Sequence, residues 1–347
     1  MTESSSFSEQ LKAGADRLFQ LLANFSKVRV LVVGDLTLDE FLTGQVERIS
    51  REAPVLILRH EATRQIPGGG ANAIYNLAKL GAGVKVAGLV GRDDRGTALC
   101  NIFETAGIDI SGIFMETNRP TVTKTRISGH ARQSVTQQIV RIDRKSDELP
   151  EMELQLQLAE YIRKESDRVD AVVCSDYGDG VLTPPVIEAA VSRPGTIVDT
   201  QKDLQRYAGA MLFTPNLPEA ELAVGYSITD AESLDRAARD LLRLTGALRI
   251  LITRGEEGMS LFERGEEGAI ASMHLPPFNR TDVFDVTGAG DTVVAALTLA
   301  LSAGGSFWEA AVLGNLAASL VVRQVGTATT SVGKMRVALE EAIELES

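Results

Sequence analysis

The chain is poor in aromatic residues, in cysteine and in positive charge. Aromatic residues make up 5% of its 347 residues and hydrophobic residues 44%, so we expect a large core built mainly from aliphatic side chains. Its two cysteines, Cys100 and Cys174, lack the CxxC spacing of a metal or redox site and are predicted to be buried thiols of a cytoplasmic protein. The net charge of −12 argues against nucleic acid or an anionic membrane as a partner.

Long apolar runs and a targeting segment are also missing. No apolar run reaches about 18 residues, so the sequence predicts no membrane span. The first ten residues, MTESSSFSEQ, are acidic and rich in serine, which fits neither a signal peptide nor a transit peptide. Because no repeat, low-complexity tract or linker interrupts the chain, we expect one domain.

Continuous apolar runs alternate with helical patterns along most of the chain. The predicted buried strands are residues 28–33, 84–90, 171–174, 196–198, 211–213 and 248–253. This alternation is typical of a three-layer α/β fold, with a mostly parallel central sheet and helices on both faces. An amphipathic helix over residues 11–25 precedes the first strand, so we divide the chain into an N-terminal tail and helix (1–27) and a main domain (28–347).

Other segments alternate apolar with polar residues, as half-exposed antiparallel strands do. They are residues 55–59, 121–128 and 137–143. We interpret them as a small β lid that projects from the main domain and is contributed by about 41–66 and 112–144. Because exposed sheet edges favour pairing with another chain, we predict a homodimer formed through this lid. A separate hairpin is predicted where residues 259–263 and 269–274 flank a turn.

The segment Asp285-Val286-Thr287-Gly288-Ala289-Gly290-Asp291 leads directly into a predicted helix. Glycines at 288 and 290 allow close approach of a ligand, and the unpaired N–H groups of the first helical turn favour an anion. A carboxylate at Asp291 would repel a bound phosphate unless it had a task there. The task that fits is to accept a proton from a hydroxyl as that hydroxyl attacks phosphorus. The alternative is a glycine-rich turn in which Asp291 merely starts a helix.

Two further motifs suit a sugar, at the strand ends where parallel sheets bind ligands. Asp35 and Asp39 follow the first predicted strand, and such an acidic pair either binds the hydroxyls of a polyol or serves the turn itself. Gly68, Gly69 and Gly70 open a helix and offer bare backbone to a ligand. Asn72 follows them and offers an amide to a hydroxyl.

Two more motifs suit a nucleotide and its metal. Asn216 and Glu219 either control a hydrated Mg²⁺ through its water ligands or form a helix cap, and the sequence leaves both readings open. Thr253, Gly255 and Gly258 end another predicted strand, where a hydroxyl and close backbone suit nucleotide phosphates or ribose.

Together these motifs resemble those of the ribokinase/PfkB family of small-molecule kinases, over roughly residues 28–335. Segments 68–72 and 285–291 match the two signatures of that family, residues 216–219 its magnesium motif and residues 253–255 its nucleotide loop. The resemblance implies a ribokinase-like fold and a carbohydrate kinase that uses ATP and Mg²⁺.

The resemblance also implies roles for individual residues. Asp291 is then the catalytic base, and the amides of Gly288, Ala289 and Gly290 form the anion hole. The implied sugar ligands are Asp39 and Asn72. On the nucleotide side, Asn315 is implied as part of the adenine pocket, and Asp285, Thr287 and residues 325–330 as the site of a monovalent cation such as K⁺.

A narrower resemblance is to the bacterial heptose 7-phosphate kinase branch of the family. It rests on residues 34–39, 48–55, 67–72, 123–126, 137–143, 175–178 and 212–216. This resemblance implies heptose 7-phosphate as the acceptor and heptose 1,7-bisphosphate as the product. Lys124, Arg126 and Arg141 lie on predicted lid strands, where they either meet a sugar phosphate or form an exposed strand face. Of the three, we expect Arg141 to be the substrate ligand, because it lies in the best-matched stretch.

The chain departs from the pattern of that branch at several positions. Asp179 stands where a lysine is usual, Glu40 stands where a basic residue is usual, and the segment between Arg126 and Gln137 is longer. These departures keep open a kinase of the same mechanism that acts on another sugar, sugar phosphate or nucleoside. A lesser alternative is a non-catalytic ligand sensor on the same fold. An oxidoreductase that binds a dinucleotide is disfavoured, because residues 33–37 lack the GxGxxG turn.

Overall fold

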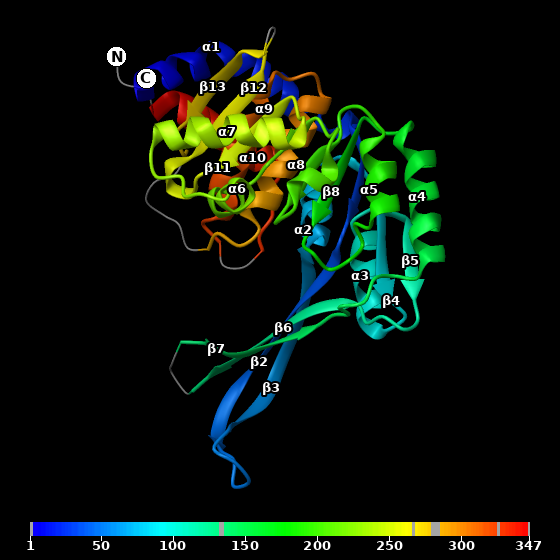
Figure 1. Cartoon of the computed structure of the whole chain (residues 1–347). Coiled ribbons are helices and arrows are strands. Elements are labelled where there is room, and N and C mark those ends of the chain that lie inside the picture. Colours follow the sequence, from blue (N-terminus) through cyan, green and yellow to red (C-terminus); the bar gives the residue numbers. More distant parts are fainter. Residues whose placement is uncertain (1–2, 132–134, 266–267, 279–284, 325–326, 346–347) are drawn as a thin grey trace.

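A nine-stranded sheet forms the centre of the molecule (Figure 1). The computed structural model describes residues 3–131, 135–265, 268–278, 285–324 and 327–345. The strand order is β13-β12-β11-β10-β9-β8-β1-β4-β5, parallel from β11 to β5 and antiparallel at β12 and β13. The bounds are β1 (Arg29–Gly34), β4 (Gly83–Gly91), β5 (Asp109–Glu116), β8 (Ala171–Asp176), β9 (Ile197–Thr200), β10 (Leu212–Phe213), β11 (Arg249–Thr253), β12 (Met259–Arg264) and β13 (Ile270–Leu275).

Helices cover both faces of this sheet. Strand β1 shows why its sequence is continuously apolar, since Val30 and Val32 enter one hydrophobic cluster while Leu31 and Val33 enter the other. The first cluster is closed by α1 (Glu3–Asn24), α2 (Gly70–Lys79), α3 (Asp94–Thr105), α8 (Ala289–Ser302), α9 (Phe307–Val321) and α10 (Val332–Leu345). The second is closed by α4 (Met152–Ser166), α5 (Pro184–Val191), α6 (Leu217–Val224) and α7 (Ala231–Thr245). The three-layer α/β fold predicted from the sequence, with a mostly parallel central sheet and helices on both faces, is therefore confirmed.

Helix α1 belongs to the body of the molecule. Its residues Leu11, Leu18 and Leu22 are buried in the first cluster, and it packs against α10 and α9. Short 3₁₀ helices within the described ranges include η1 (Phe25–Lys27), η2 (Leu204–Tyr207) and η3 (Gly255–Glu257). Among the described residues, none of the helices has both the length and the apolar character needed to cross a membrane. Cys100 and Cys174 are both buried and free, as predicted.

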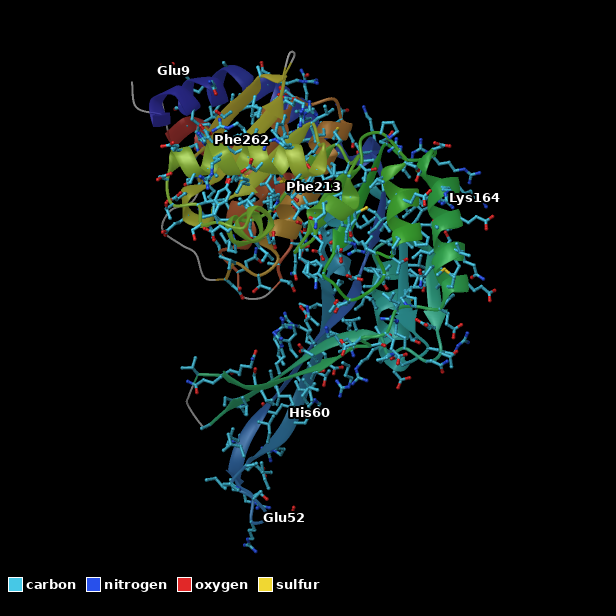
Figure 2. All side chains as sticks on the ribbon, viewed as in Figure 1. Glu9, Glu52, His60, Lys164, Phe213 and Phe262 are labelled. Carbon is cyan, nitrogen blue, oxygen red and sulfur yellow. The ribbon has the colours of Figure 1, made fainter. Side chains whose placement is uncertain are left out.

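A second sheet of four strands projects from the body and forms the lid (Figure 1). Its order is β3-β2-β6-β7, with bounds β2 (Leu36–Ile49), β3 (Leu56–Gly69), β6 (Val122–His130) and β7 (Gln137–Arg144). Strand β2 begins two residues after β1 ends, and its first five residues are buried while its last three are exposed. Figure 2 shows Glu52 at the far tip of the lid, whereas Phe213 and Phe262 lie inside the body.

Two details of the lid differ from the sequence prediction. Residues 112–116, which we assigned to the lid, lie in β5 at the edge of the large sheet. The strands of the lid are also not all antiparallel, because β2 and β6 pair in parallel with Asp39 opposite Lys124. Alternation of polar and apolar residues reports that one face of a strand is covered, and it carries no information about the direction of the neighbouring strand.

Candidate active site

The predicted motifs meet at the carboxyl ends of the parallel strands. A cavity of about 170 Å³ opens there, between the ends of β8, β9 and β11 and the start of α8. Its lining residues are Asp176, Tyr177, Asp199, Thr200, Gln201, Thr214, Asn216, Glu219, Thr253, Gly288, Gly290 and Asp291. Segments that lie more than 100 residues apart in the sequence thus form one polar site.

Asp291 lies in the first turn of α8 and is only 3% exposed. Two side chains hold its carboxylate: the Nδ2 amide of Asn72 donates a hydrogen bond of 2.7 Å to Oδ2, and the hydroxyl of Tyr177 donates one of 2.9 Å to Oδ1. Asn72 is itself held by Asn76, which donates to both its side-chain and its backbone oxygen. The carboxylate is therefore fixed in position by groups from α2 and from the loop after β8.

The pKa of Asp291 is raised from 3.8 to about 6. Burial is the main cause and the nearby Asp39 carboxylate adds to it, while the hydrogen bonds from Asn72 and Tyr177 and the charge of Lys124 oppose the rise. A carboxylate with a pKa near the working pH is ionised yet basic enough to accept a proton in a transition state. The environment of Asp291 therefore suits a general base.

Gly288 precedes α8 in a left-handed conformation, with φ of 77°. A Cβ atom at this position would lie 2.6 Å from Nδ2 of Asn72, so a side chain here would collide with the group that holds Asp291. A Cβ at Gly290 would meet nothing within 4 Å, which leaves open space above the first turn of α8. The sequence predicts an anion site at this space, formed by the N–H groups of Gly288, Ala289 and Gly290. Of these, the N–H of Ala289 donates to the backbone oxygen of Val286 at 3.2 Å.

The triple glycine is required by close packing against β2. A Cβ atom added at Gly68 would lie 2.6 Å from Cγ of Asp39. One added at Gly69 would lie 2.9 Å from Oγ1 of Thr37, and one at Gly70 would lie 2.8 Å from the backbone oxygen of Asp35. These glycines therefore let the first strand of the lid lie directly against the start of α2.

Asp39 and Asp35 have different roles, although the sequence presented them as a pair. Asp39 is buried on the first part of β2, and its Oδ1 lies 2.9 Å from Nη1 of Arg126. Asp35 is fully buried and accepts three backbone N–H groups, from Tyr177, Asp179 and Val181. The prediction that Asp35 binds substrate is therefore wrong: its carboxylate shapes the loop after β8 and presents Tyr177 to Asp291.

Asn216 and Glu219 form the capping box of α6. Oδ1 of Asn216 accepts the N–H of Glu219, and Oε2 of Glu219 accepts the N–H of Asn216. The two residues nevertheless line the cavity together with Asp199, so the cap also places a carboxylate there. Burial raises the pKa of Glu219, and burial with repulsion from Asp291 and Glu219 raises that of Asp199 well above 3.8. Buried carboxylates that repel one another favour a bound cation.

Of the residues predicted for the nucleotide, Asn216, Thr253, Gly288 and Gly290 line this cavity, whereas Gly255, Gly258 and Asn315 are not among its lining residues. Thr253 lines it at the end of β11, next to Gly255 in η3, and Gly258 closes the turn with φ of 83°. Asn315 on α9 donates a hydrogen bond of 2.7 Å to the backbone oxygen of Pro276 and so fixes the segment that follows β13.

The segment predicted to hold a monovalent cation lies beside the anion site. Oδ1 of Asp285 accepts the N–H of Thr287, and Thr327 approaches Gly288 closely enough to contact a Cβ atom there at 3.2 Å. Residues 325 and 326 of that predicted site lie outside the described part of the chain.

Arg141 lies on β7, half exposed, and pairs with Asp143 at 2.8 Å. It stands directly opposite Arg126, which contacts Asp39. Arg141 therefore occupies the face of the lid that looks toward the site, one strand farther out than Arg126.

Sequence reasoning gave no role to Tyr177 or Asp199. Tyr177 follows β8 directly, Asp199 lies in β9, and both line the cavity. Burial, and then the charge of Asp291, raise the pKa of the Tyr177 hydroxyl well above 10, so it stays a donor to Asp291. The available signal was the position of both residues at the carboxyl ends of predicted strands.

Comparison with known proteins agrees with this geometry. A family model described as pfkB family carbohydrate kinase matches residues 28–333. The bifunctional protein HldE of Pelobacter propionicus is 44% identical over 316 residues, which cover 88% of this chain and 63% of that protein. HldE of Geobacter metallireducens is 43% identical over 317 residues, covering 90% and 63%. The matched region thus spans 63%, less than two thirds, of the length of these relatives.

Solved structures share the fold at low sequence identity. Arabidopsis thaliana ribokinase complexed with ribose and ATP is 20% identical with a TM-score of 0.68, and the match covers 91% of this chain and 99% of that one. Phosphofructokinase-2 from Escherichia coli in complex with potassium is 20% identical with a TM-score of 0.72 and the same coverage.

Proposed function

The chain belongs to the pfkB family of carbohydrate kinases, and from that premise we propose that it transfers the γ-phosphoryl group of ATP to a hydroxyl of a sugar phosphate. The acceptor we propose is heptose 7-phosphate, which gives heptose 1,7-bisphosphate. The observation that carries this proposal is the position of Asp291, a buried and basic carboxylate held at the mouth of an anion site. We place the reaction in the cytoplasm, where ATP is available and buried free thiols remain reduced.

The reaction needs few chemical groups from the protein, because phosphoryl transfer depends mainly on positioning and electrostatics. ATP lies along the strand ends beside Thr253, Gly255 and Gly258, with Asn315 near the adenine. The amides of residues 288–290 hold the γ-phosphate. Asp291 accepts the proton of the acceptor hydroxyl, which Asp39 helps to orient, while the O–P bond forms and the bond to ADP breaks.

Mg²⁺ fits the carboxylates of the cavity. Asp199 and Glu219 both have raised pKa values, because their negative charges would be buried without a positive partner. A divalent cation beside them would supply that positive charge. The described residues hold no cluster of three or more His, Cys, Asp or Glu side chains suited to a metal, which favours a hydrated ion that shares the phosphates of the nucleotide. When bound, Mg²⁺ supplies positive charge to the phosphate oxygens.

A monovalent cation such as K⁺ also fits the predicted loop. Oγ1 atoms of Thr327 and Thr330 are buried, and neither makes a hydrogen bond within the described part of the chain. Hydroxyl oxygens left in this state are suitable ligands for a cation. Asp285 and Thr287 lie on the neighbouring turn, so an ion here would stabilise the loop that forms the anion site.

The lid supports a phosphorylated acceptor. One rung across its four strands carries Arg64, Phe41, Arg126 and Arg141, which are directly opposite one another in register. We call these four residues the arginine rung. The guanidinium groups of Arg64 and Arg126 lie 5.0 and 5.2 Å from the centre of the Phe41 ring, so both make cation–π contacts with the same aromatic ring.

The arginine rung shares a face of the lid with Asp39. Asp39 lies on β2, two residues before Phe41 and nearer the body. A phosphate at the rung would therefore lie on the order of 7 Å from a hydroxyl beside Asp39. This spacing fits a sugar whose phosphate is at the end opposite the reacting hydroxyl. This face carries four cationic side chains and two carboxylates, so it forms a positive patch in a chain of net charge −12. The cations are Arg64, Arg126, Arg141 and Lys124, and the carboxylates are Asp39 and Asp143.

Replacing Arg141 with glutamine is expected to raise KM for a phosphorylated acceptor by roughly tenfold, because one charge-assisted hydrogen bond to phosphate is lost. KM for ATP should not change. Arg59→Gln is the matched control, since Arg59 is another lid arginine and pairs with Glu47 and Gln45 away from the rung. Steady-state kinetics with both substrates test this, and an equal KM for Arg141→Gln and the wild type would remove Arg141 from the substrate site.

A panel of sugars, sugar phosphates and nucleosides scored by ADP release tests the proposed acceptor. We expect the highest kcat/KM with heptose 7-phosphate and little turnover with the unphosphorylated sugar. Faster turnover of another panel member would assign the enzyme to that substrate instead. Binding of ATP and sugar with no ADP release from any acceptor would favour a ligand sensor on the same fold.

We also propose that the protein forms a homodimer through the lid. Strands β3 and β7 are free edges of the lid sheet within the described residues, and large apolar side chains are exposed on it. They are Ile49, Val55, Leu56, Ile139, Val140 and Ile142.

Light scattering at working concentration should give about twice the 37.2 kDa mass of the chain. Ile142→Asp should shift this mass toward that of one chain, because a charge would be buried in the lid interface. Leu222→Asp, at another exposed apolar position, on α6 of the body, should leave the mass unchanged. A wild-type mass of one chain would refute the dimer.

A further inference from the structure

A buried carboxylate that the mechanism above does not use lies where the body meets the lid. Asp179 follows β8 and is 8% exposed, and its Oδ2 atom accepts no hydrogen bond within the described part of the chain. Burial raises the pKa of this carboxyl, while the charges of Lys124 and Lys145 lower it. An unpaired buried carboxylate oxygen is costly, so a missing partner is to be expected at this point.

The backbone holds Asp179 in place from both sides. Its N–H donates to Oδ2 of Asp35 at 3.0 Å, and its carbonyl oxygen accepts Nη1 of Arg119 at 3.2 Å. The residues on either side, Gly178 and Gly180, have positive φ values of 76° and 97°. These contacts fix the backbone of Asp179 in the loop, and the buried Asp35 is thereby explained as the anchor of the loop.

Lys145 does not satisfy this carboxylate. Its Nζ atom lies 4.0 Å from Oδ1 of Asp179 and closer, at 3.6 Å, to the exposed Asp147. Lys145 is itself about half exposed, and ion pairs of this kind contribute little. The contact also involves Oδ1, whereas Oδ2 is the atom without a partner.

Lys124 links Asp179 to the catalytic carboxylate. It stands opposite Asp39 on the lid, and its Nζ lies 5.6 Å from the centre of the Tyr177 ring, whose hydroxyl donates to Asp291. The register of the lid brings Lys124 near Asp179 as well, because Asp143 on β7 lies directly opposite Lys124 and Lys145, two residues later, approaches Oδ1 of Asp179 at 4.0 Å. The charge of Lys124 lowers the pKa of both Asp179 and Asp291. The wall of the acceptor site therefore carries one strong acceptor, Asp179, and one strong donor, Lys124.

We propose that Asp179 and Lys124 form a hydroxyl-selective subsite for the acceptor, in which a sugar hydroxyl donates to Oδ2 of Asp179 and accepts from Nζ of Lys124. A hydroxyl is both donor and acceptor, so it satisfies both groups at once. A phosphate at this place would meet a carboxylate and be repelled, which directs the phosphate of the substrate to the arginine rung. This inference rests on the proposed function, and it names which end of the acceptor each part of the site recognises.

Calorimetric titration of acceptors tests the subsite without depending on turnover. The probes are heptose 7-phosphate and its monodeoxy analogues, each lacking one hydroxyl. One analogue should bind the wild type about 10- to 100-fold more weakly, the range for a hydrogen bond to a charged group. Asp179→Asn should weaken the parent acceptor by at least tenfold and leave that one analogue unchanged, because the interaction is already lost.

Two further variants separate this role from a purely structural one. Asp147→Asn removes the other carboxylate near Lys145 and should leave every affinity unchanged. Lys124→Met should show the same coupling to the same analogue as Asp179→Asn, and it tests the subsite even where Asp179→Asn fails to fold. Equal weakening of all analogues by either variant, or unchanged affinity of the parent acceptor, would overturn the subsite. Tight acceptor binding without ADP release would instead overturn only the proposed function, and absence of any acceptor binding would overturn both.

Discussion

Replacing Asp291 with asparagine is expected to lower kcat by about 10²- to 10⁴-fold, the range for a positioned general base. Asparagine keeps the size of the side chain and can still accept the hydrogen bond from Tyr177 or Asn72. It cannot take a proton from the acceptor hydroxyl. KM for ATP should therefore remain near the wild-type value while turnover is lost.

The same substitution is expected to stabilise the fold at neutral pH. Burial raises the pKa of Asp291 to about 6 in the folded state, so the native protein binds this proton more tightly than the unfolded chain does. The folded state is thus favoured below pH 3.8 and loses that advantage as pH rises through about 6. At pH 7 the wild type carries the cost of an ionised buried carboxylate, and asparagine removes on the order of 1–3 kcal/mol of it.

Urea unfolding of both proteins at pH 7 and ADP release under saturating substrates check these two effects together. Loss of turnover with equal or greater stability would identify Asp291 as a catalytic group. In the wild type, kcat/KM should also fall as the pH drops below about 6, because the base becomes protonated. Turnover of Asp291→Asn within a factor of about three of the wild type would contradict the assignment.

Replacing Gly288 with alanine is expected to reduce both stability and turnover. The left-handed φ of 77° costs a residue with a Cβ about 1–2 kcal/mol. The new methyl group would also lie 2.6 Å from Nδ2 of Asn72 and push it away from Asp291. We expect kcat to fall by roughly 10²-fold, since the base would lose a fixed position at the edge of the anion site.

Gly290→Ala separates the two effects. A Cβ at this position meets nothing within 4 Å, so the free energy of unfolding should change by less than about 0.5 kcal/mol. The methyl group would instead occupy the space that we assign to the γ-phosphate, so ATP binding and turnover should still decline. Thermal unfolding and ADP release distinguish the pair, and a Gly290→Ala enzyme with full activity would show that the phosphate lies elsewhere.

Most of the fold could be predicted because the sheet is parallel and buried on both faces. Strand β1 is apolar at every internal position, since its alternate residues enter the two hydrophobic clusters. The direction of β6 relative to β2 and the place of residues 112–116 were wrong, because both depend on which strands become neighbours in space. That choice is made by tertiary packing and leaves no local pattern in either strand.

The site could be predicted as far as its motifs reach. Asp291, Gly288 and Gly290 line one cavity, as expected from a turn that leads into a helix start, because both are local structures with local signals. Asp35 was assigned to the substrate because a carboxylate at a strand end has the same sequence appearance whether it binds a hydroxyl or three backbone amides. Arg64 and Phe41 became part of the proposed acceptor site only through the cross-strand register of the lid.

The central claim is that the carboxylate of Asp291 takes the proton of the acceptor hydroxyl. A crystal structure with a non-hydrolysable ATP analogue and heptose 7-phosphate measures this most directly. We predict one Asp291 oxygen within about 3.2 Å of the attacking hydroxyl, with the γ-phosphate at the start of α8. An acceptor whose hydroxyls all lie beyond about 5 Å from Asp291 in the closed complex would contradict the account.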